Sequence, residues 1–329
     1  MGNEELGGKS LQVLQFKSKE ALESAKKAIL EEKMSKKADA ALRDYVRKWN
    51  DTTRAGVLSL ACEAVNGNMN ELVPLQAAML LIAATMDIHD DIIDKSAVKV
   101  TGETIYGNTG TEVALLVGNA FLVKGFVRLC KAIAMLPRER QSLIIDTVKN
   151  SLFEVIRAHI AEVELRNKKW EVKPNEYVHV LEEKAADIEG LMRVSAIFSG
   201  GTSSEVEALG KYGRCLGLML AVRSDYVDVF EPRELENRVK NECLPLPVLY
   251  ALNNGNRRRR IQKILSRRII SKSAAQELVE TIYQTPERYH LRRSLRKVLK
   301  ESLQSLDNIR PSKAKANLQV LAMSMLEDL

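Results

Sequence analysis

Helical spacing of apolar residues is the feature that most limits what this chain can fold into. Apolar residues recur three and four positions apart in long runs without proline, as in residues 18–49, 53–68 and 113–136. This spacing is typical of helices with one buried face. Glycine (17) and proline (8) are scarce in a chain of 329 residues, and no useful stretch alternates apolar and polar residues. The pattern predicts an all-α protein of ten or more helices.

The expected helices follow one another without a linker or a low-complexity tract. Pro74 is expected to open a very apolar helix that runs to Asp94, and residues 99–112, with three glycines, are expected to form a loop. Seven more helices are expected in the remainder of the chain. The organisation predicts one domain over residues 1–329, in which residues 1–35 form a loosely attached N-terminal helix.

Composition and charge exclude several classes of function. The 50 basic and 43 acidic residues give a net charge of +7, which is too mild to indicate a nucleic-acid partner. No apolar run reaches the ~18 residues that a transmembrane helix needs. The N-terminal residues lack the apolar segment of a signal peptide. The four cysteines are widely separated: Cys62, Cys130, Cys215 and Cys243. We expect reduced thiols and a cytoplasmic protein.

An acidic stripe ends the helix that opens at Pro74. Asp87, Asp90, Asp91 and Asp94 lie three and four residues apart and therefore share one helix face. Carboxylates at this spacing repel by roughly 0.2–0.5 kcal/mol per pair. The helix dipole also disfavours negative charge at a C-terminus. A cation would offset both effects, and oxygen ligands favour Mg²⁺. The alternative is a solvated helix end without a ligand.

A second helix repeats this design. The apolar stretch at residues 216–222 is followed by Ser224, Asp225 and Asp228. Two helices that end in carboxylates could face each other across a cavity and hold Mg²⁺ with a diphosphate, as facing helices do in other bundles.

Four segments resemble one family. They read HDDIID (89–94), GNTGTEVALLVGNAFL (107–122), LGLMLAVRSDYVDV (216–229) and LPLPVLYAL (244–252), and they are similar to the trans-isoprenyl diphosphate synthases, also called the polyprenyl synthetase family. The resemblance implies a single-domain helical bundle around a deep apolar cavity, usually dimeric. It also implies a Mg²⁺-dependent prenyltransferase that joins an allylic prenyl diphosphate to isopentenyl diphosphate.

The resemblance implies a role for individual residues. Lys184 matches the catalytic lysine that holds the allylic diphosphate. Arg54 and Lys99 match substrate-binding cations, and Thr85 and Met86 match positions that help to set product length. The implied Mg²⁺ ligands are Asp90, Asp91, Asp94, Asp225 and Asp228.

The sequence also departs from the family pattern. The first aspartate of the second motif is replaced by Ser224. The basic segment that binds isopentenyl diphosphate reads NDTTRA at residues 50–55, so only Arg54 remains and Asp51 adds a negative charge. Each charge-assisted contact to a diphosphate contributes ~1.5–3 kcal/mol, so binding of this substrate should be weakened.

Three functions therefore stay open at the level of sequence. The first is a divergent prenyltransferase that still elongates an allylic diphosphate. The second is a non-elongating subunit that pairs with a related synthase, so that the oligomer is a homodimer or a heterodimer. The third is a terpene-synthase-like lyase, which ionises the allylic diphosphate without isopentenyl diphosphate. The sequence does not fix the product length.

Overall fold

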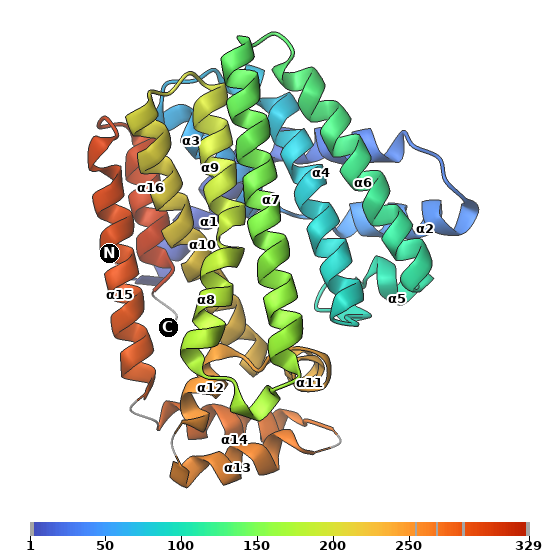
Figure 1. The fold of residues 1–329 in the computed structure, drawn as a ribbon, viewed down its shortest axis with the longest axis vertical. Helices are drawn as coiled ribbons and strands as arrows, with labels where there is room; N and C mark the ends of the chain where they lie inside the picture. The colour runs from blue at the N-terminus through green and yellow to red at the C-terminus, as the bar shows by residue number, and fades with distance from the viewer. Residues whose placement is uncertain (1–2, 254, 268, 285–286, 327–329) are drawn as a thin grey trace. The chain divides into compact units, whose positions relative to one another are not determined.

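The computed structural model describes residues 3–253, 255–267, 269–284 and 287–326. These residues are almost entirely helical, which confirms the predicted all-α class (Figure 1). The exception is a two-stranded antiparallel hairpin, in which β1 (Val98–Lys99) pairs with β2 (Gly102–Glu103). All of it except Val98 lies inside residues 99–112, the segment expected to be a loop.

The chain divides into two compact units, each built from separated segments. The first unit contains the residues up to Lys149, Gly190–Gly210 and Leu306–Leu321. The second unit contains Asn150–Glu189, Lys211–Ser305 and the residues from Ala322 onward. The single domain over residues 1–329 stays a prediction, and each unit is described by itself.

The first unit is built mainly from the N-terminal helices. Its complete elements, besides the hairpin, are α1 (Asn3–Leu30), α2 (Lys36–Lys48), α3 (Thr52–Ala64), α4 (Met69–Ile93), α5 (Ile105–Thr109), α6 (Thr111–Ile133) and η2 (Leu306–Asn308). Four helices contribute to both units, namely α7 (Arg138–Arg166), α9 (Ala186–Phe198), α10 (Ser203–Phe230) and α16 (Lys313–Ser324).

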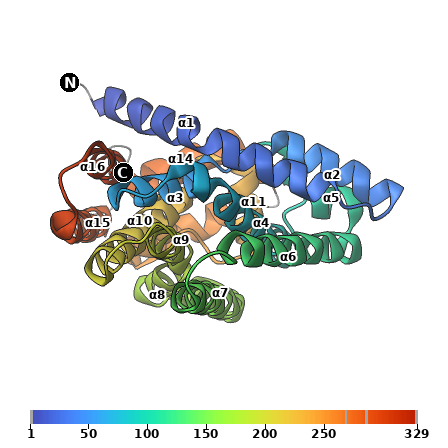
Figure 2. The ribbon, with the colours of Figure 1, turned by 90° about the horizontal axis from the view of Figure 1, so that it is seen from above.

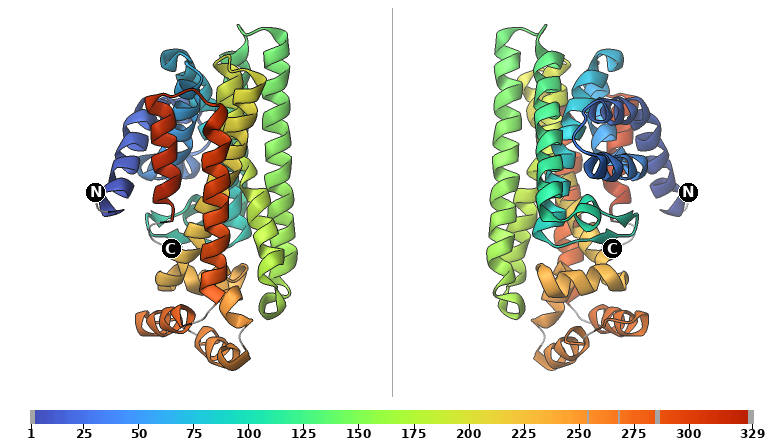
Figure 3. Two further views of the ribbon diagram at one scale, coloured as in Figure 1. Left: turned by 90° about the vertical axis from the view of Figure 1, so that its left-hand side faces the viewer. Right: turned by 90° about the vertical axis from the view of Figure 1, so that its right-hand side faces the viewer.

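The second unit adds shorter helices to the remaining parts of α7 and α10. They are η1 (Lys169–Glu171), α8 (Pro174–Lys184), α11 (Pro232–Asn241), α12 (Leu246–Leu252), α13 (Gly255–Leu265), α14 (Lys272–Tyr283) and α15 (Glu287–Ser305). Helices α13 and α14 lie side by side (Figures 1 and 3). Helix α10 packs closely on the end of α8, where a Cβ added at Gly217 would lie 2.9 Å from the Ala185 carbonyl oxygen.

The N-terminal helix is an integral part of the first unit. Helix α1 runs past α3 and α4 (Figure 2) and buries Leu14, Ala25 and Ile29. The expectation of a loosely attached helix is therefore wrong from Leu14 onward. Ala25 and Ala28, three residues apart, are both buried on the face of α1 that packs against the neighbouring helices.

Helix α4 begins earlier than expected. Asn68 caps it by accepting a hydrogen bond from the Asn70 N–H (3.0 Å), so α4 begins at Met69 and Pro74 lies inside it. The expectation that Pro74 opens this helix is wrong. A capping side chain satisfies free N–H groups at the new start, whereas a proline in the second turn removes only one helical hydrogen bond.

Two glycines let α6 lie directly against α4. A Cβ added at Gly125 would lie 2.7 Å from the Cγ1 atom of Ile82 and 3.2 Å from the Ala78 carbonyl oxygen. A Cβ at Gly118, two turns earlier, would lie 2.5 Å from Nε2 of His89. The two helices lie side by side (Figure 1), so this contact fixes the position of the helix that carries the acidic stripe.

Helices α4 and α6 are also long and apolar enough to cross a membrane by length and composition. For α4, 72% of the most apolar window is buried inside the structure, as in the core helix of a soluble protein. For α6 this share is 33%, so much of its apolar surface is not covered by this chain. A pair of such helices is weak evidence for membrane insertion, because core helices pass the same test.

Candidate active site

The acidic stripe lies at a helix end whose backbone turns back on itself. Helix α4 ends at Ile93, Asp94 is the C-cap residue, and Lys95 adopts a left-handed conformation with φ of 53°. The Ser96 N–H donates to the Asp91 carbonyl oxygen (2.8 Å) and the Lys95 N–H donates to the Ile92 carbonyl oxygen (3.3 Å). These two bonds form a Schellman motif, which satisfies the last carbonyls of the helix.

The hairpin after this turn returns a cation to the stripe. Lys99 on β1 forms an ion pair with Asp91, whose side chain is 9% exposed. Burial raises the pKa of the Asp91 carboxyl to about 6, and Lys99 opposes this increase. Asp94 is also buried, and Asp90 is partly buried. The structure therefore places Lys99 beside Asp91, on the helix end that carries Asp90 and Asp94, and the predicted metal-binding and substrate-binding roles of these residues stay predictions.

Arg54 lies at the start of α3 and is held by two carboxylates. Its guanidinium donates to both oxygens of Asp87 (2.9 and 3.0 Å) and to Oδ2 of Asp51 (2.9 Å). Asp51 also caps α3 by accepting from the Arg54 N–H (3.1 Å). A diphosphate would have to compete with both carboxylates for this cation. The predicted substrate-binding role of Arg54 stays a prediction.

The two positions matched to product length differ in their surroundings. Thr85 is buried, and its hydroxyl donates to the carbonyl oxygens of Leu81 and Gly118, both at 3.2 Å. Met86 is partly buried. Thr85 therefore joins α4 to α6, and a role of either residue in product length stays a prediction.

The donor set at the end of α4 fits Mg²⁺ by its chemistry. Asp90, Asp91 and Asp94 supply oxygen ligands only, at a place where burial of Asp91 makes negative charge unfavourable without a cation. Within the described ranges, no three His, Cys, Asp or Glu side chains are arranged to hold a metal ion by themselves.

The second motif lies in the second unit and has a different environment. Asp225 on α10 is 3% exposed. Its Oδ1 accepts from the guanidinium of Arg238 and from the Tyr177 hydroxyl (3.4 Å), and its Oδ2 accepts from the Leu246 N–H (2.7 Å). Burial raises the pKa of the Asp225 carboxyl, and Arg238 opposes this. Ser224, at the position of the missing aspartate, is exposed.

Asp228, three residues further along α10, lies at the edge of this cluster. Its side chain is 23% exposed, and its Oδ2 lies 3.7 Å from Nε of Arg238. Burial raises the pKa of Asp228 to about 7, against the attraction of Arg238. A Mg²⁺ role for Asp225 and Asp228 stays a prediction.

Lys184 at the end of α8 reaches the same cluster. Its ammonium group forms an ion pair with Glu162, whose side chain is 2% exposed. Lys184 itself is 22% exposed, so its charge remains partly accessible to water. Its predicted role as the catalytic lysine is not tested by this contact.

Sequence reasoning did not find Arg238, Tyr177 and Glu162. Arg238 is buried and donates to the Tyr177 hydroxyl (2.9 Å), and its guanidinium lies 5.9 Å from the centre of the Tyr177 ring. Glu162, on α7, contacts Lys184. The sequence did contain one signal for Arg238: it shares a helix face with Leu235 and Val239, the two buried apolar residues of α11.

The structure combines an all-helical fold with an apolar helix that ends in closely spaced carboxylates. The polyprenyl synthetase family model matches residues 35–284, and the chain belongs to this family.

Curated relatives agree with this assignment. The chain is 28% identical to a geranylgeranyl diphosphate synthase of Methanosarcina mazei over 58% of each chain. It is 26% identical to a short chain isoprenyl diphosphate synthase of Methanothermobacter thermautotrophicus over 72% of each chain. The match therefore spans less than two thirds of the first relative. The pairwise identity is modest, which is consistent with the altered second motif.

Solved structures share the fold. A geranylgeranyl pyrophosphate synthetase from Pyrococcus horikoshii superposes with a TM-score of 0.81 at 21% identity, covering 98% of each chain. A geranylgeranyl pyrophosphate synthetase from Geoglobus acetivorans gives a TM-score of 0.83 at 18% identity, covering 96% of this chain and 99% of the other. These likenesses confirm the predicted isoprenoid-synthase-type bundle.

Proposed function

We propose that this protein is a Mg²⁺-dependent trans-prenyltransferase that extends an allylic prenyl diphosphate with isopentenyl diphosphate. The observation that carries the proposal is the intact set of Asp90, Asp91 and Asp94 at the end of a buried apolar helix, in a chain that belongs to the polyprenyl synthetase family. The relatives are synthases of prenyl diphosphates, which supports the same reaction.

In this proposal, Asp90, Asp91 and Asp94 would hold Mg²⁺, which when bound would neutralise the charge of the leaving diphosphate. The bond between the allylic carbon and the diphosphate oxygen breaks, and the electron pair leaves with the diphosphate. The double bond of isopentenyl diphosphate then supplies the electrons of the new carbon–carbon bond, and loss of a proton restores a double bond. Lys99 adds a positive charge beside Asp91, where a diphosphate oxygen would gather negative charge.

A second candidate function is a non-elongating subunit of a heteromeric synthase. The observation that favours it is that Arg54 donates hydrogen bonds to the carboxylates of both Asp51 and Asp87. This cation is the one retained in the segment matched to isopentenyl diphosphate binding, and it is already neutralised.

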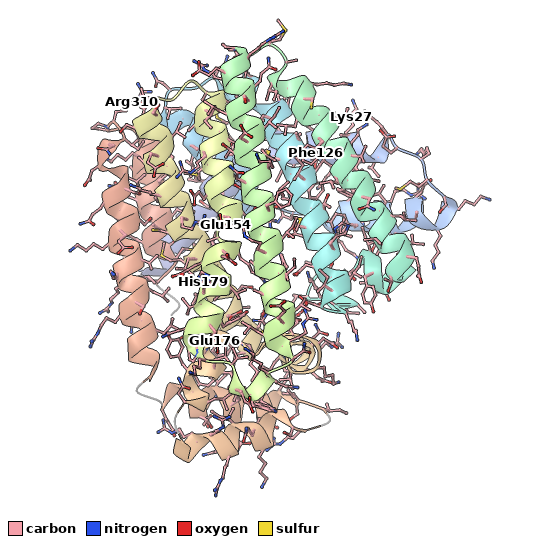
Figure 4. The ribbon with its side chains drawn as sticks, viewed as in Figure 1. Lys27, Phe126, Glu154, Glu176, His179 and Arg310 are labelled. Atoms are coloured by element: carbon pink, nitrogen blue, oxygen red, sulfur yellow. The ribbon has the colours of Figure 1, made fainter. Side chains whose placement is uncertain are left out.

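The oligomer is part of the proposal. Helix α6 exposes Leu115, Leu116, Val123, Phe126 and Val127, and Figure 4 places Phe126 on this helix. These residues recur at spacings of three, four and seven, which gathers them on one face. We assign this face to a second copy of the chain, because an apolar helix face of this length is rarely left in water.

The four cysteines are free, which supports a reducing, cytoplasmic location.

The deciding experiment incubates the protein with Mg²⁺ and farnesyl diphosphate, with and without isopentenyl diphosphate, and identifies the products by mass spectrometry. We expect a longer prenyl diphosphate that requires isopentenyl diphosphate. Asp91→Asn should reduce its formation by about 100-fold or more, the scale of losing a group that stabilises the transition state. Asp146→Asn is the matched control, because Asp146 is an exposed aspartate on α7.

Other outcomes would replace the proposal. A hydrocarbon or alcohol formed without isopentenyl diphosphate would indicate a diphosphate lyase. No turnover with any allylic chain length, together with no Mg²⁺-dependent binding of the diphosphate, would leave the non-elongating subunit.

A further inference from the structure

Arg238 is the centre of the second carboxylate cluster. Four carboxylates surround it: it pairs with Asp225, its Nη1 lies 2.9 Å from Glu242 and 3.9 Å from Glu162, and its Nε lies 3.7 Å from Asp228. The side chain is 9% exposed. The Arg238 guanidinium therefore occupies the space among these carboxylates that a divalent ion would need.

The carboxylate that would be the principal ligand of such an ion already accepts hydrogen bonds at both oxygens. Asp225 is buried, and both of its oxygens accept hydrogen bonds, from Arg238 and Tyr177 on one side and from the Leu246 N–H on the other. A Mg²⁺ ion binds carboxylate oxygen at about 2.0–2.1 Å. At that distance it would lie against the guanidinium, and the two positive charges would repel strongly in a buried site. Lys99 beside Asp91 differs, because its side chain is 43% exposed and can turn into water when an ion binds.

The contacts around Arg238 come from four directions. Tyr177 belongs to α8, Asp225 and Asp228 to α10, Glu162 to α7, and Glu242 follows α11. The backbone of α12 joins through Leu246. The Arg238 guanidinium therefore contacts several helices at once, as a bound metal ion would. Unlike a metal ion, it is part of the chain and cannot dissociate into solvent.

We propose that Arg238 takes the place of a divalent cation in the second carboxylate cluster, so that Asp225 and Asp228 bind no Mg²⁺ and the divalent ion binds at the motif at the end of α4. The inference rests on the proposed function, because the α4 site serves as its reference. It assigns Arg238 as a positioning residue: it holds Asp225 and the ends of α8, α10 and α12 in place.

The test counts bound Mn²⁺ by electron paramagnetic resonance, with the metal alone and with an unreactive allylic diphosphate analogue. We expect Asp225→Asn to bind the same number of Mn²⁺ ions as the wild type, with a dissociation constant within about 2-fold. Asp91→Asn should weaken binding by about 10-fold or more, as expected for loss of a charged ligand. Loss of one equivalent of Mn²⁺ in Asp225→Asn would overturn the inference.

Arg238→Met supplies the complementary test. It removes the internal cation and leaves the four carboxylates facing one another, so Mn²⁺ or Mg²⁺ should now bind there as well. The metal should therefore raise the Tm of the variant by several degrees more than it raises the Tm of the wild type. Arg233→Met is the matched control, because Arg233 is an exposed arginine on the same helix. If Arg238→Met does not fold, the Asp225→Asn measurement still decides.

The two proposals fail in different ways. A wild type that binds no Mn²⁺, with or without the analogue, would contradict the proposed function and would still agree with a closed second cluster. A wild type that loses bound Mn²⁺ equally on Asp91→Asn and Asp225→Asn would keep the proposed function and overturn the role assigned to Arg238.

Discussion

At the scale of single residues, Arg54 gives the sharpest prediction. Its guanidinium is shared by Asp51, whose side chain is 11% exposed, and Asp87, which is 42% exposed. Arg54→Met leaves both carboxylates without this partner. We expect the free energy of unfolding to fall by about 1–3 kcal/mol, less than for a fully buried pair because Asp87 reaches solvent. Urea unfolding of the purified protein measures this change.

The control for this substitution is Lys149→Met, which removes an ion pair with Asp146. Both side chains of that pair are 55% exposed, so the free energy of unfolding should change by less than about 0.5 kcal/mol. Equal effects of the two substitutions would contradict the structural role that we assign to Arg54.

The residues of the first motif could be predicted from sequence, and those around Arg238 could not. Asp90, Asp91 and Asp94 share a face because positions three and four apart on one helix always do. The partners of Arg238 lie 13 residues away for Asp225 and 61 residues away for Tyr177. Such contacts depend on how separate helices pack, which the spacing within one helix does not determine.

At the scale of elements, the contact between α4 and α6 depends on glycine. A Cβ at Gly125 would meet the Ala78 carbonyl oxygen at 3.2 Å and the Ile82 backbone nitrogen at 3.1 Å, and backbone atoms cannot rotate away. We expect Gly125→Ala to lower the free energy of unfolding by about 1–3 kcal/mol through overpacking, despite the higher helix propensity of alanine. Thermal and urea unfolding measure the change.

Gly255→Ala is the matched control at the start of α13. Nothing lies within 4 Å of a Cβ added there. This variant should be as stable as the wild type or slightly more stable, because alanine favours helix. If Gly125→Ala behaved in the same way, α6 would not lie as close to α4 as the structure has it.

The helices themselves were largely predictable, and their ends were not. The apolar spacing indicated the long helices, because burial of one face imposes that spacing. The start of α4 at Met69 depends on the Asn68 side chain, and its end depends on the left-handed Lys95, a residue type that gives no signal for this conformation. The hairpin that returns Lys99 to Asp91 is four residues of strand, too short for a visible alternation.

At the scale of the whole molecule, the exposed apolar face of α6 predicts self-association. Leu116 is 64% exposed and Val123 is 65% exposed, one heptad apart on the same helix. Sedimentation velocity should give about twice the 36.9 kDa mass of the chain for the wild type. The double variant Leu116→Glu and Val123→Glu should sediment as a monomer, because two buried carboxylates per chain would oppose the contact.

The control, Val100→Glu with Ile269→Glu, changes two similarly exposed residues outside α6 and should keep the mass of the wild type. A monomeric wild type would show that no second copy covers this face. A double α6 variant that stays dimeric would show that the dimer forms through another surface.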